Sequence, residues 1–131
     1  MRNGSVLWSH GVKFTPEPES AAATRRFVEG CLRDHDLCYL VDPVRLVASE
    51  LATNAALHTK TKFGVVLEGT ADEVLLTVSD GAASPPVVRD VTHSATEGRG
   101  MHIVSHYSRR WGVVEGSSGD SKAVWASFGL R

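Results

Sequence analysis

The chain has 131 residues, of which 42% are hydrophobic and 22% are charged, and its formal net charge is -1. These values exclude a disordered chain, a coiled coil and a two-domain enzyme, and they predict a single folded domain over residues 1–131. A near-zero charge provides no general attraction to nucleic acid or to an acidic membrane, so we expect neither as a partner.

The cysteine and hydropathy patterns favour a cytoplasmic protein. The two cysteines, Cys31 and Cys38, form neither a dense disulfide framework nor a zinc-type CxxC pair. No apolar stretch reaches the roughly 18 residues of a membrane helix, and the N-terminus lacks the basic and apolar regions of a secretion signal. We therefore expect a reducing, cytoplasmic environment.

In chain order, the first predicted element is an edge strand over residues 6–14, which a pair of prolines ends. A helix follows, capped by Thr15 or a neighbouring residue, and the spacing of its apolar residues carries it to about His35. After a connector, Asp42 is the expected N-cap of a second helix that runs to about His58. Both helices carry apolar residues at helical spacing, so both should pack on the core.

The second half of the chain predicts most of the sheet. Two β-prone runs at 63–68 and 73–78 are separated by four residues, a length that suits a hairpin. Residues 81–97 are rich in Gly, Ala, Ser, Pro and Thr and show no periodicity, so we expect a long loop that acts as a mobile lid. A short helix from Met101 to Tyr107 follows. The closing strands are expected at 111–114 and 122–128. This order predicts an α+β fold, a two-layer sandwich with helices on one side of one sheet.

Glu50 and Asn54 lie one turn apart in the second predicted helix, about 40° from each other around its axis. Polar helix faces produce such pairs by chance, and spacing alone leaves this alternative open. In the functional interpretation, Asn54 offers a neutral oxygen to a hard cation such as Mg²⁺, and Glu50 deprotonates a hydroxyl or a water. Glu50 is thus a candidate general base and Asn54 a candidate metal ligand.

Asp80 follows an apolar strand directly and precedes the long loop. A carboxylate there can accept a hydrogen bond from the exocyclic amine of a base, whereas a purine with a carbonyl at that position would leave the site unpaired. Asp80 and Gly81 also form one of the commonest turn dipeptides, so a turn-forming role is the alternative.

Gly98, Arg99, Gly100 and Met101 lie at the loop-to-helix junction before the third predicted helix. Glycines and the unpaired N–H groups of a helix N-terminus can approach phosphate oxygens, and the helix dipole favours an anion. An ordinary helix-starting turn has the same composition, so the segment is a candidate phosphate site only together with other evidence.

Two further candidates are weaker. His102 and His106 are four residues apart, as two zinc ligands can be, but no third ligand cluster accompanies them, and we expect no metal there. Ser49 lies in a helix without a nucleophile elbow, so it is not expected to be a catalytic nucleophile.

Four segments of the chain, taken in order, resemble the histidine-kinase-like ATPase (GHKL) family over about residues 10–130. The segments are 50–58 (ELATNAALH), 78–80 (VSD), 98–104 (GRGMHIV) leading to 111–112 (WG), and 122–125 (KAVW). More narrowly, the chain resembles the small anti-sigma-factor serine/threonine kinases of actinobacterial type, which consist of this domain alone.

The resemblance implies a Bergerat-type α/β sandwich, in which one mixed, mainly antiparallel sheet is covered by helices on one face. It implies that ATP lies between the helices and the lid, with Glu50 as the general base and Asn54 on the Mg²⁺ that bridges the phosphates. Asp80 would bind the adenine amine. The phosphate-binding segment would comprise Gly98 and Gly100, which cradle the phosphates, with Arg99 and Met101 beside them.

By the same resemblance, the protein would phosphorylate a serine of an antagonist protein with Mg-ATP and would sequester a sigma factor when the antagonist is absent. The chain departs from the family at Ala82, where a glycine is expected near adenine, and at Ala123, where a threonine hydroxyl is expected near the terminal phosphate. A nucleotide-gated protein-binding module without phosphoryl transfer is therefore the alternative. Homodimerisation stays open.

Overall fold

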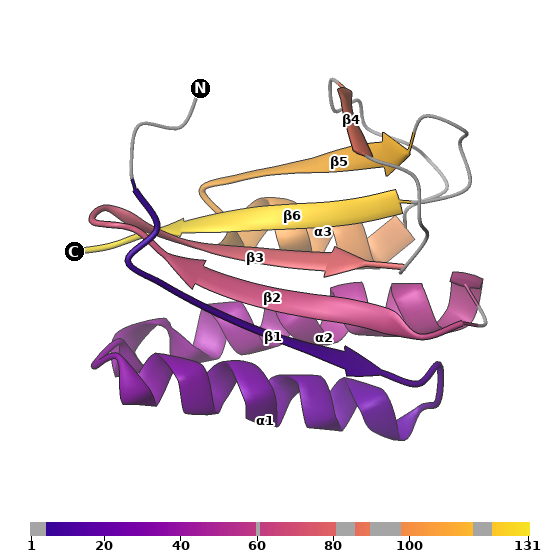
Figure 1. Cartoon of the computed structure of the whole chain (residues 1–131), viewed down its shortest axis with the longest axis horizontal. Coiled ribbons are helices and arrows are strands. Elements are labelled where there is room, and N and C mark those ends of the chain that lie inside the picture. Colours follow the sequence, from indigo (N-terminus) through magenta and orange to yellow (C-terminus); the bar gives the residue numbers. More distant parts are fainter. Residues whose placement is uncertain (1–4, 60, 81–85, 90–97, 117–121) are drawn as a thin grey trace.

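The computed structural model describes residues 5–59, 61–80, 86–89, 98–116 and 122–131 (Figure 1). In chain order the elements are β1 (Trp8–Phe14), α1 (Glu19–Asp34), the short 3₁₀ helix η1 (Cys38–Leu40), α2 (Val41–Thr59), β2 (Phe63–Gly69), β3 (Glu73–Ser79), β4 (Pro86–Arg89), α3 (Gly98–Tyr107), β5 (Arg110–Gly116) and β6 (Lys122–Gly129).

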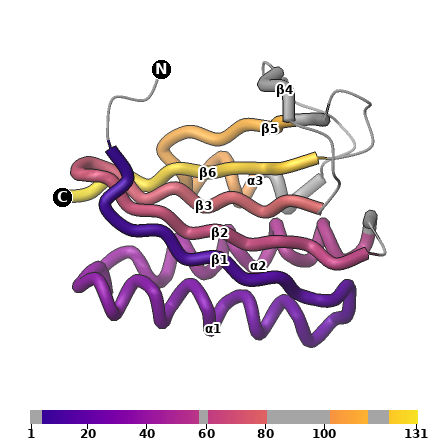
Figure 2. The backbone as a smooth tube through the Cα atoms, viewed as in Figure 1, coloured from indigo at the N-terminus to yellow at the C-terminus, as the bar shows by residue number. Residues whose placement is uncertain are grey.

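The described strands form one six-stranded sheet in the order β1-β2-β3-β6-β5-β4, and each pairing between them is antiparallel. α1 packs on β1 and β2, α2 on β2, β3 and β6, and α3 on β5, so the helices lie in that order across the sheet (Figure 2). The expected α+β two-layer sandwich is confirmed, and its described strands are antiparallel rather than mixed. Within the described residues, none of the helices has the length and hydropathy needed to cross a membrane.

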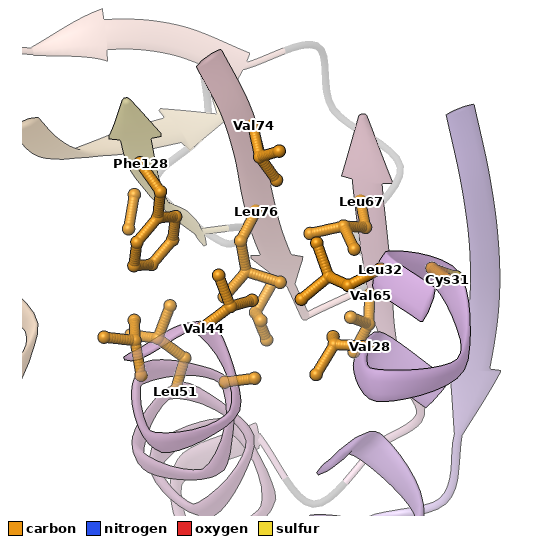
Figure 3. Packing of buried hydrophobic residues seen from close by; sticks show 14 of the residues in the cluster. Val28, Cys31, Leu32, Val44, Leu51, Val65, Leu67, Val74, Leu76 and Phe128 are labelled. Carbon is orange, nitrogen blue, oxygen red and sulfur yellow. The ribbon is translucent and has the colours of Figure 1, made fainter. Parts of the chain in front are cut away.

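The core lies between the sheet and the helices. Alternate residues of β2, namely Phe63, Val65 and Leu67, are fully buried, and the residues between them are half-buried. This period of two is that of a strand with one face on the core. Val28 and Leu32 of α1 point toward the same strand (Figure 3), and α2 contributes its own apolar stripe.

Both long helices start differently from the sequence expectation. Pro18 occupies the N-cap position of α1 without a side-chain cap, and the Thr15 carbonyl accepts a hydrogen bond from Ser20 Oγ at 2.6 Å. α2 begins at Val41, because η1 runs directly into it, so the expected N-cap Asp42 lies inside its first turn. In the first turn, the Asp42 carboxylate still stabilises the helix by its favourable interaction with the helix dipole.

The segment expected to be one long loop, 81–97, contains the strand β4. It pairs with β5 in a register that runs from Pro86 opposite Gly116 to Arg89 opposite Val113. The expected lid otherwise falls on residues 81–85 and 90–97, which lie outside the described residues. Two consecutive valines form the middle of this strand, too short a run to show a period of two.

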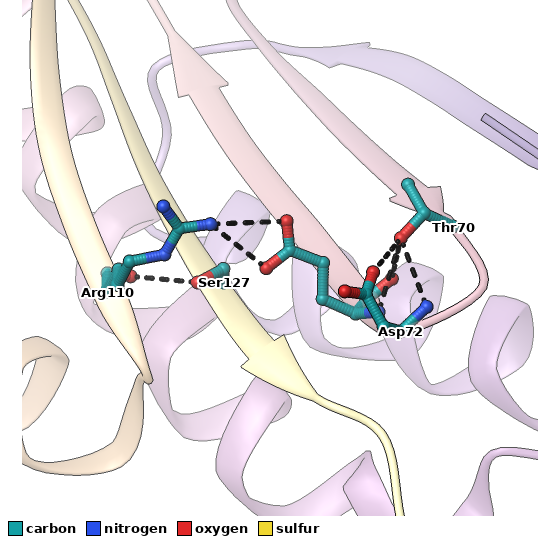
Figure 4. A network of polar contacts seen from close by, with 5 residues as sticks. Thr70, Asp72, Arg110 and Ser127 are labelled. Atoms are coloured by element: carbon teal, nitrogen blue, oxygen red, sulfur yellow. Dashed lines mark hydrogen bonds and ion pairs between the residues drawn. The ribbon is translucent and has the colours of Figure 1, made fainter. Parts of the chain in front are cut away.

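A polar network holds three strands together on the sheet face away from the helices (Figure 4). Glu73 of β3 is 5% exposed, and Arg110 Nη2 of β5 donates to its two carboxylate oxygens at 3.3 and 3.4 Å. Ser127 of β6 lies between them, with Oγ donating to the Arg110 carbonyl. The guanidinium satisfies a carboxylate that would be costly to bury alone.

Aromatic contacts tie the edge strand β1 to the end of α1. The Trp8 indole covers Gly69 of β2 and stacks on the His35 imidazole, with ring centroids 4.0 Å apart and planes 8° from parallel. His10 Nε2 lies 3.0 Å from His35 Nε2, within hydrogen-bond distance. The edge strand is therefore anchored at both β2 and α1.

Candidate functional site

One flank of α2 faces α1. Arg25 Nη1 of α1 donates to Ser49 Oγ of α2 at 2.9 Å, and Arg45 Nη1 of α2 donates to Glu29 Oε1 of α1 at 3.1 Å. These contacts fix how α2 is rotated about its own axis.

Glu50 and Asn54 lie on the opposite flank of α2. At about 100° per residue, Asn54 is about 180° and Glu50 about 140° around the helix from Arg45. Because α2 lies between α1 and α3 across the sheet, this flank is the one directed to α3. Both residues are half-buried, as expected beside the apolar stripe. The structure thus brings the two predicted residues to the α2–α3 side.

Asp80 lies at the same end of the sandwich as the carboxyl end of α2. Gly64 at the start of β2 pairs with Ser79 at the end of β3, and α2 ends at Thr59, four residues before β2 begins. Figure 1 shows the end of α2, the start of β2 and the end of β3 together on the right of the view. The carboxyl end of α2, which carries Asn54, and the end of β3, which leads to Asp80, therefore lie at the same end of the sandwich.

The N-terminus of α3 lies at this end as well. α3 ends at Tyr107, and β5 starts shortly afterwards at Arg110, which pairs with Ser127 near the far end of β6. Since α3 runs back under the sheet, its N-terminal end lies toward the start of β6 and the end of β3 (Figure 1). Helix N-termini attract anions through their unpaired N–H groups and their dipole.

The phosphate-binding candidates sit inside this helix rather than before it. The first turn of α3 consists of Gly98, Arg99, Gly100 and Met101. The helix therefore begins at Gly98, about one turn before the expected start at Met101. Glycine destabilises a helix less in the first turn than in the interior, because the first N–H groups have no intrahelical partner.

Asp80 makes backbone contacts with the first residue of β6. The Asp80 N–H donates to the Lys122 carbonyl at 3.0 Å, and the Lys122 N–H donates to Asp80 Oδ2 at 3.1 Å. Thr61 Oγ1 donates to the Asp80 carbonyl at 3.3 Å. These contacts were not predicted from the sequence, although Lys122 begins one of the four segments that resemble the family. The contact between Asp80 and Lys122 spans 42 residues and depends on strand register.

The donor set fits a magnesium ion that is shared with phosphates. Asn54 supplies a neutral oxygen and Glu50 a carboxylate one turn away, and Mg²⁺ in nucleotide sites commonly uses few protein ligands beside phosphate oxygens. The described part of the chain holds no group of three or more His, Cys, Asp or Glu residues that could bind a metal alone. His102 and His106 are exposed on α3.

The chain departs from the family pattern at Ala82 and at Ala123. Ala82 lies outside the described residues. Ala123 lies in β6 directly opposite Ser79 of β3, and its side chain brings no hydroxyl to this end of the sheet.

Neither a protein-family model nor a curated protein sequence matches the chain significantly. The assignment of a function therefore depends on the residues themselves and on their placement.

Proposed function

We propose that the protein is a histidine-kinase-like ATPase domain that binds ATP with Mg²⁺ at the end of the sandwich where α2, β3 and α3 meet. The observation that carries the proposal is this convergence. An oxygen pair from α2, a carboxylate at the end of β3 and a helix N-terminus each suit one part of a nucleotide: metal, adenine amine and phosphates.

The proposed reaction is transfer of the ATP γ-phosphoryl group to a serine of an antagonist protein. Glu50 accepts the serine hydroxyl proton, the serine oxygen bonds to the γ-phosphorus, and the bond to the β–γ bridging oxygen breaks to release ADP. Mg²⁺ would supply charge neutralisation on the phosphates. Positioning and electrostatics provide most of the rate in such transfers, so a site with one base and one metal-ligating amide is sufficient.

The proposed cellular role follows from the family resemblance. The protein would sequester a sigma factor in the cytoplasm, where ATP and sigma factors are found, and would release it on partner exchange with the antagonist. ATP, the sigma factor and the antagonist are its proposed partners.

A binding module that uses ATP without transferring phosphate is the second candidate. Ala123 favours it, because no hydroxyl from this position of β6 can reach the terminal phosphate. ATP would then order the site and present a protein-binding surface.

Variants of α2 separate the two candidates. Glu50→Gln is expected to keep ATP affinity, since the replacement is nearly isosteric, and to lower phosphoryl transfer by about 10²- to 10⁴-fold. Asn54→Ala is expected to lower Mg²⁺-dependent ATP affinity itself. Thr53→Ala, an exposed residue of the same helix, is the matched control and should change neither.

Calorimetry with Mg-ATP and transfer of radiolabelled phosphate to a co-expressed antagonist are the two measurements. Binding without any transfer by the wild-type protein would reject the kinase and leave the module. Absence of ATP binding would reject both.

A further inference from the structure

Two imidazoles from separate elements meet beside the edge strand β1. His10 lies in β1, His35 follows the last residue of α1, and their Nε2 atoms are 3.0 Å apart. The ring centroids are 5.2 Å apart, so the two Nε2 atoms face each other. His10 is opposite Leu67, near the end of β2 that is farthest from Asp80. The pair is therefore separate from the proposed nucleotide site.

The surrounding structure holds both rings in place. His10 lies within the ladder between β1 and β2, and the His35 N–H donates to the carbonyls of Cys31 and Leu32 at the end of α1. The Trp8 indole stacks on His35 with ring planes 8° from parallel, which restricts rotation of the His35 ring. Solvent reaches the pair, because His10 is exposed and His35 is half-buried.

The distance between the two nitrogens matches that between neighbouring ligands of one metal ion. Imidazole nitrogens bind transition metals at about 2.0 to 2.1 Å. Two such nitrogens are about 2.8 to 3.0 Å apart when they subtend a right angle at the metal, and about 3.3 to 3.4 Å apart at the tetrahedral angle. The observed 3.0 Å lies in the range of the right angle.

We propose that His10 and His35 together bind one late transition-metal ion, Cu²⁺ or Ni²⁺, and that this ion fastens β1 to the end of α1. A right angle between ligands is typical of the tetragonal sites of these two ions, whereas Zn²⁺ favours a tetrahedral site. Cu²⁺ should bind most tightly, as the general order of divalent affinities predicts. Mg²⁺ prefers oxygen ligands and should not bind here, so this site is independent of the proposed function.

The metal takes the place of a proton between the two rings. In the metal-free pair, one neutral imidazole carries its proton on Nε2 and donates a hydrogen bond to the Nε2 of the other. When the metal binds, this proton moves to Nδ1 of the same ring, and a small rotation of the exposed His10 ring directs its lone pair at the ion. Among the described residues, no third His, Cys, Asp or Glu completes the site, so water fills the remaining positions.

A hydrogen bond between the two rings that never gives way to a metal is the alternative. It predicts that Cu²⁺ binds the chain equally well with one ring or with both. In the proposed site the second imidazole binds intramolecularly, so removal of either ring should weaken Cu²⁺ binding by about 10²-fold. His10→Gln and His35→Gln each remove one ligand.

The histidines of α3 require a control of their own. His102 and His106 are exposed and four residues apart on one helix, so they can bind the same ions. The titrations are therefore made in a background chain that carries His102→Gln and His106→Gln, which should keep the site at β1. Ser9→Ala is the matched control, because Ser9 is exposed and neighbouring residues of a strand point to opposite faces of the sheet.

Trp8 provides an independent readout. A Cu²⁺ ion bound to His35 lies close to the stacked indole and should quench its fluorescence. Trp8→Phe keeps an aromatic ring against His35, so this variant should bind Cu²⁺ and lose most of the quenching. Quenching of the same extent in Trp8→Phe would show that the ion binds elsewhere, which overturns the proposal.

The experiment is calorimetric titration of the background chain and its variants with Cu²⁺ and Ni²⁺, after circular dichroism has established that each is folded. Pulsed electron paramagnetic resonance of the Cu²⁺ complex shows how many imidazoles bind the ion. Two imidazoles in the background chain and in Ser9→Ala, and one with the expected loss of affinity in each histidine variant, support the proposal. One imidazole or none in the background chain overturns it, and so does an unchanged affinity in whichever histidine variant folds. No nucleotide is present, so this result is separate from the test of the proposed function.

Discussion

At the scale of single residues, two glycines illustrate how local space decides the effect of one methyl group. Gly69 lies under the Trp8 indole, and a Cβ at this position would overlap the ring atoms of Trp8. Gly30 lies on the exposed side of α1, where a Cβ would meet nothing within 4 Å. The same substitution should therefore have opposite effects at the two sites.

We predict that Gly69→Ala destabilises the protein by about 1 to 3 kcal/mol, because Trp8 must leave its place against β2 and its stack on His35. Gly30→Ala should stabilise it by about 0.5 to 1 kcal/mol, since alanine restricts the unfolded chain and favours the helix. Urea unfolding monitored by circular dichroism measures both. Equal effects of the two substitutions would contradict the packing of Trp8 on Gly69.

At the scale of elements, the half-buried carboxylate of Glu29 joins α1 to α2. It accepts hydrogen bonds from Arg33 of its own helix at 2.9 and 3.0 Å and from Arg45 of α2 at 3.1 Å. The hydrogen bonds from Arg33, and next the one from Arg45, hold the pKa of Glu29 below its ordinary value of 4.5. The same pair of helices is fixed near Ser49, so this cluster helps to set the rotation of α2.

The lowered pKa predicts a pH-dependent contribution to stability. A carboxylate whose pKa is lower in the folded state stabilises that state above its ordinary pKa, and the contribution disappears as the pH falls through the lowered value. Glu29→Gln should therefore reduce the melting temperature slightly near pH 7, because exposed ion pairs are weak. The difference from the wild type should shrink to nothing in acid and in high salt.

Thermal melts of both proteins across a pH series check this expectation. A difference that grows toward acid would show that the sign is wrong, and Glu19→Gln, an exposed carboxylate in the first turn of the same helix, provides a comparison.

Elements with a clear period were predictable from sequence, and elements defined by their partners were not. β2 shows apolar residues at every second position, and the expected strand at 63–68 matches the structure within one residue. β4 is four residues long and forms only because β5 offers it an edge. The start of α2 moved for a related reason, since η1 leads directly into it and a side-chain cap at Asp42 was unnecessary.

In the candidate site, too, local features were predictable from the sequence and contacts between elements were not. Residue types and local spacing marked Glu50, Asn54 and Asp80 as candidates with open alternatives, and the family resemblance supplied the roles proposed for them. The bond from the Lys122 amide depends on the pairing of β3 with β6, and the flank on which Glu50 lies depends on the contacts of α2 with both neighbouring helices. Such relations arise from tertiary packing, which the sequence pattern does not specify.

At the scale of the whole molecule, the two ends of the sandwich differ in character. One end holds the candidate nucleotide site, with Asp80 and the N-terminus of α3. The other end holds the turn between β2 and β3, where Thr70 Oγ1 donates to Asp72 Oδ1 at 3.0 Å and Glu73 pairs with Arg110. The continuous core between them means that a ligand at one end can stabilise the other without touching it.

This coupling gives a prediction for hydrogen exchange. The central strands β2, β3 and β6 pack on the helices and are paired on both sides, so their slowest amides are expected to exchange only through global unfolding. A ligand that binds the folded state alone raises the free energy of global unfolding by RT ln(1 + [L]/Kd). At a free Mg-ATP concentration of about 100 times Kd, these amides should exchange about 100-fold more slowly. The effect should include Val74 and Phe128, at the end of the sheet away from Asp80.

Amides of the edge strand β1 that exchange by local fraying should slow much less. Mass spectrometry of exchange with and without Mg-ATP measures both classes, and Mg²⁺ alone is the control. Slowing confined to residues beside Asp80 would show that the central strands open without releasing the nucleotide, and would contradict a single cooperative unit.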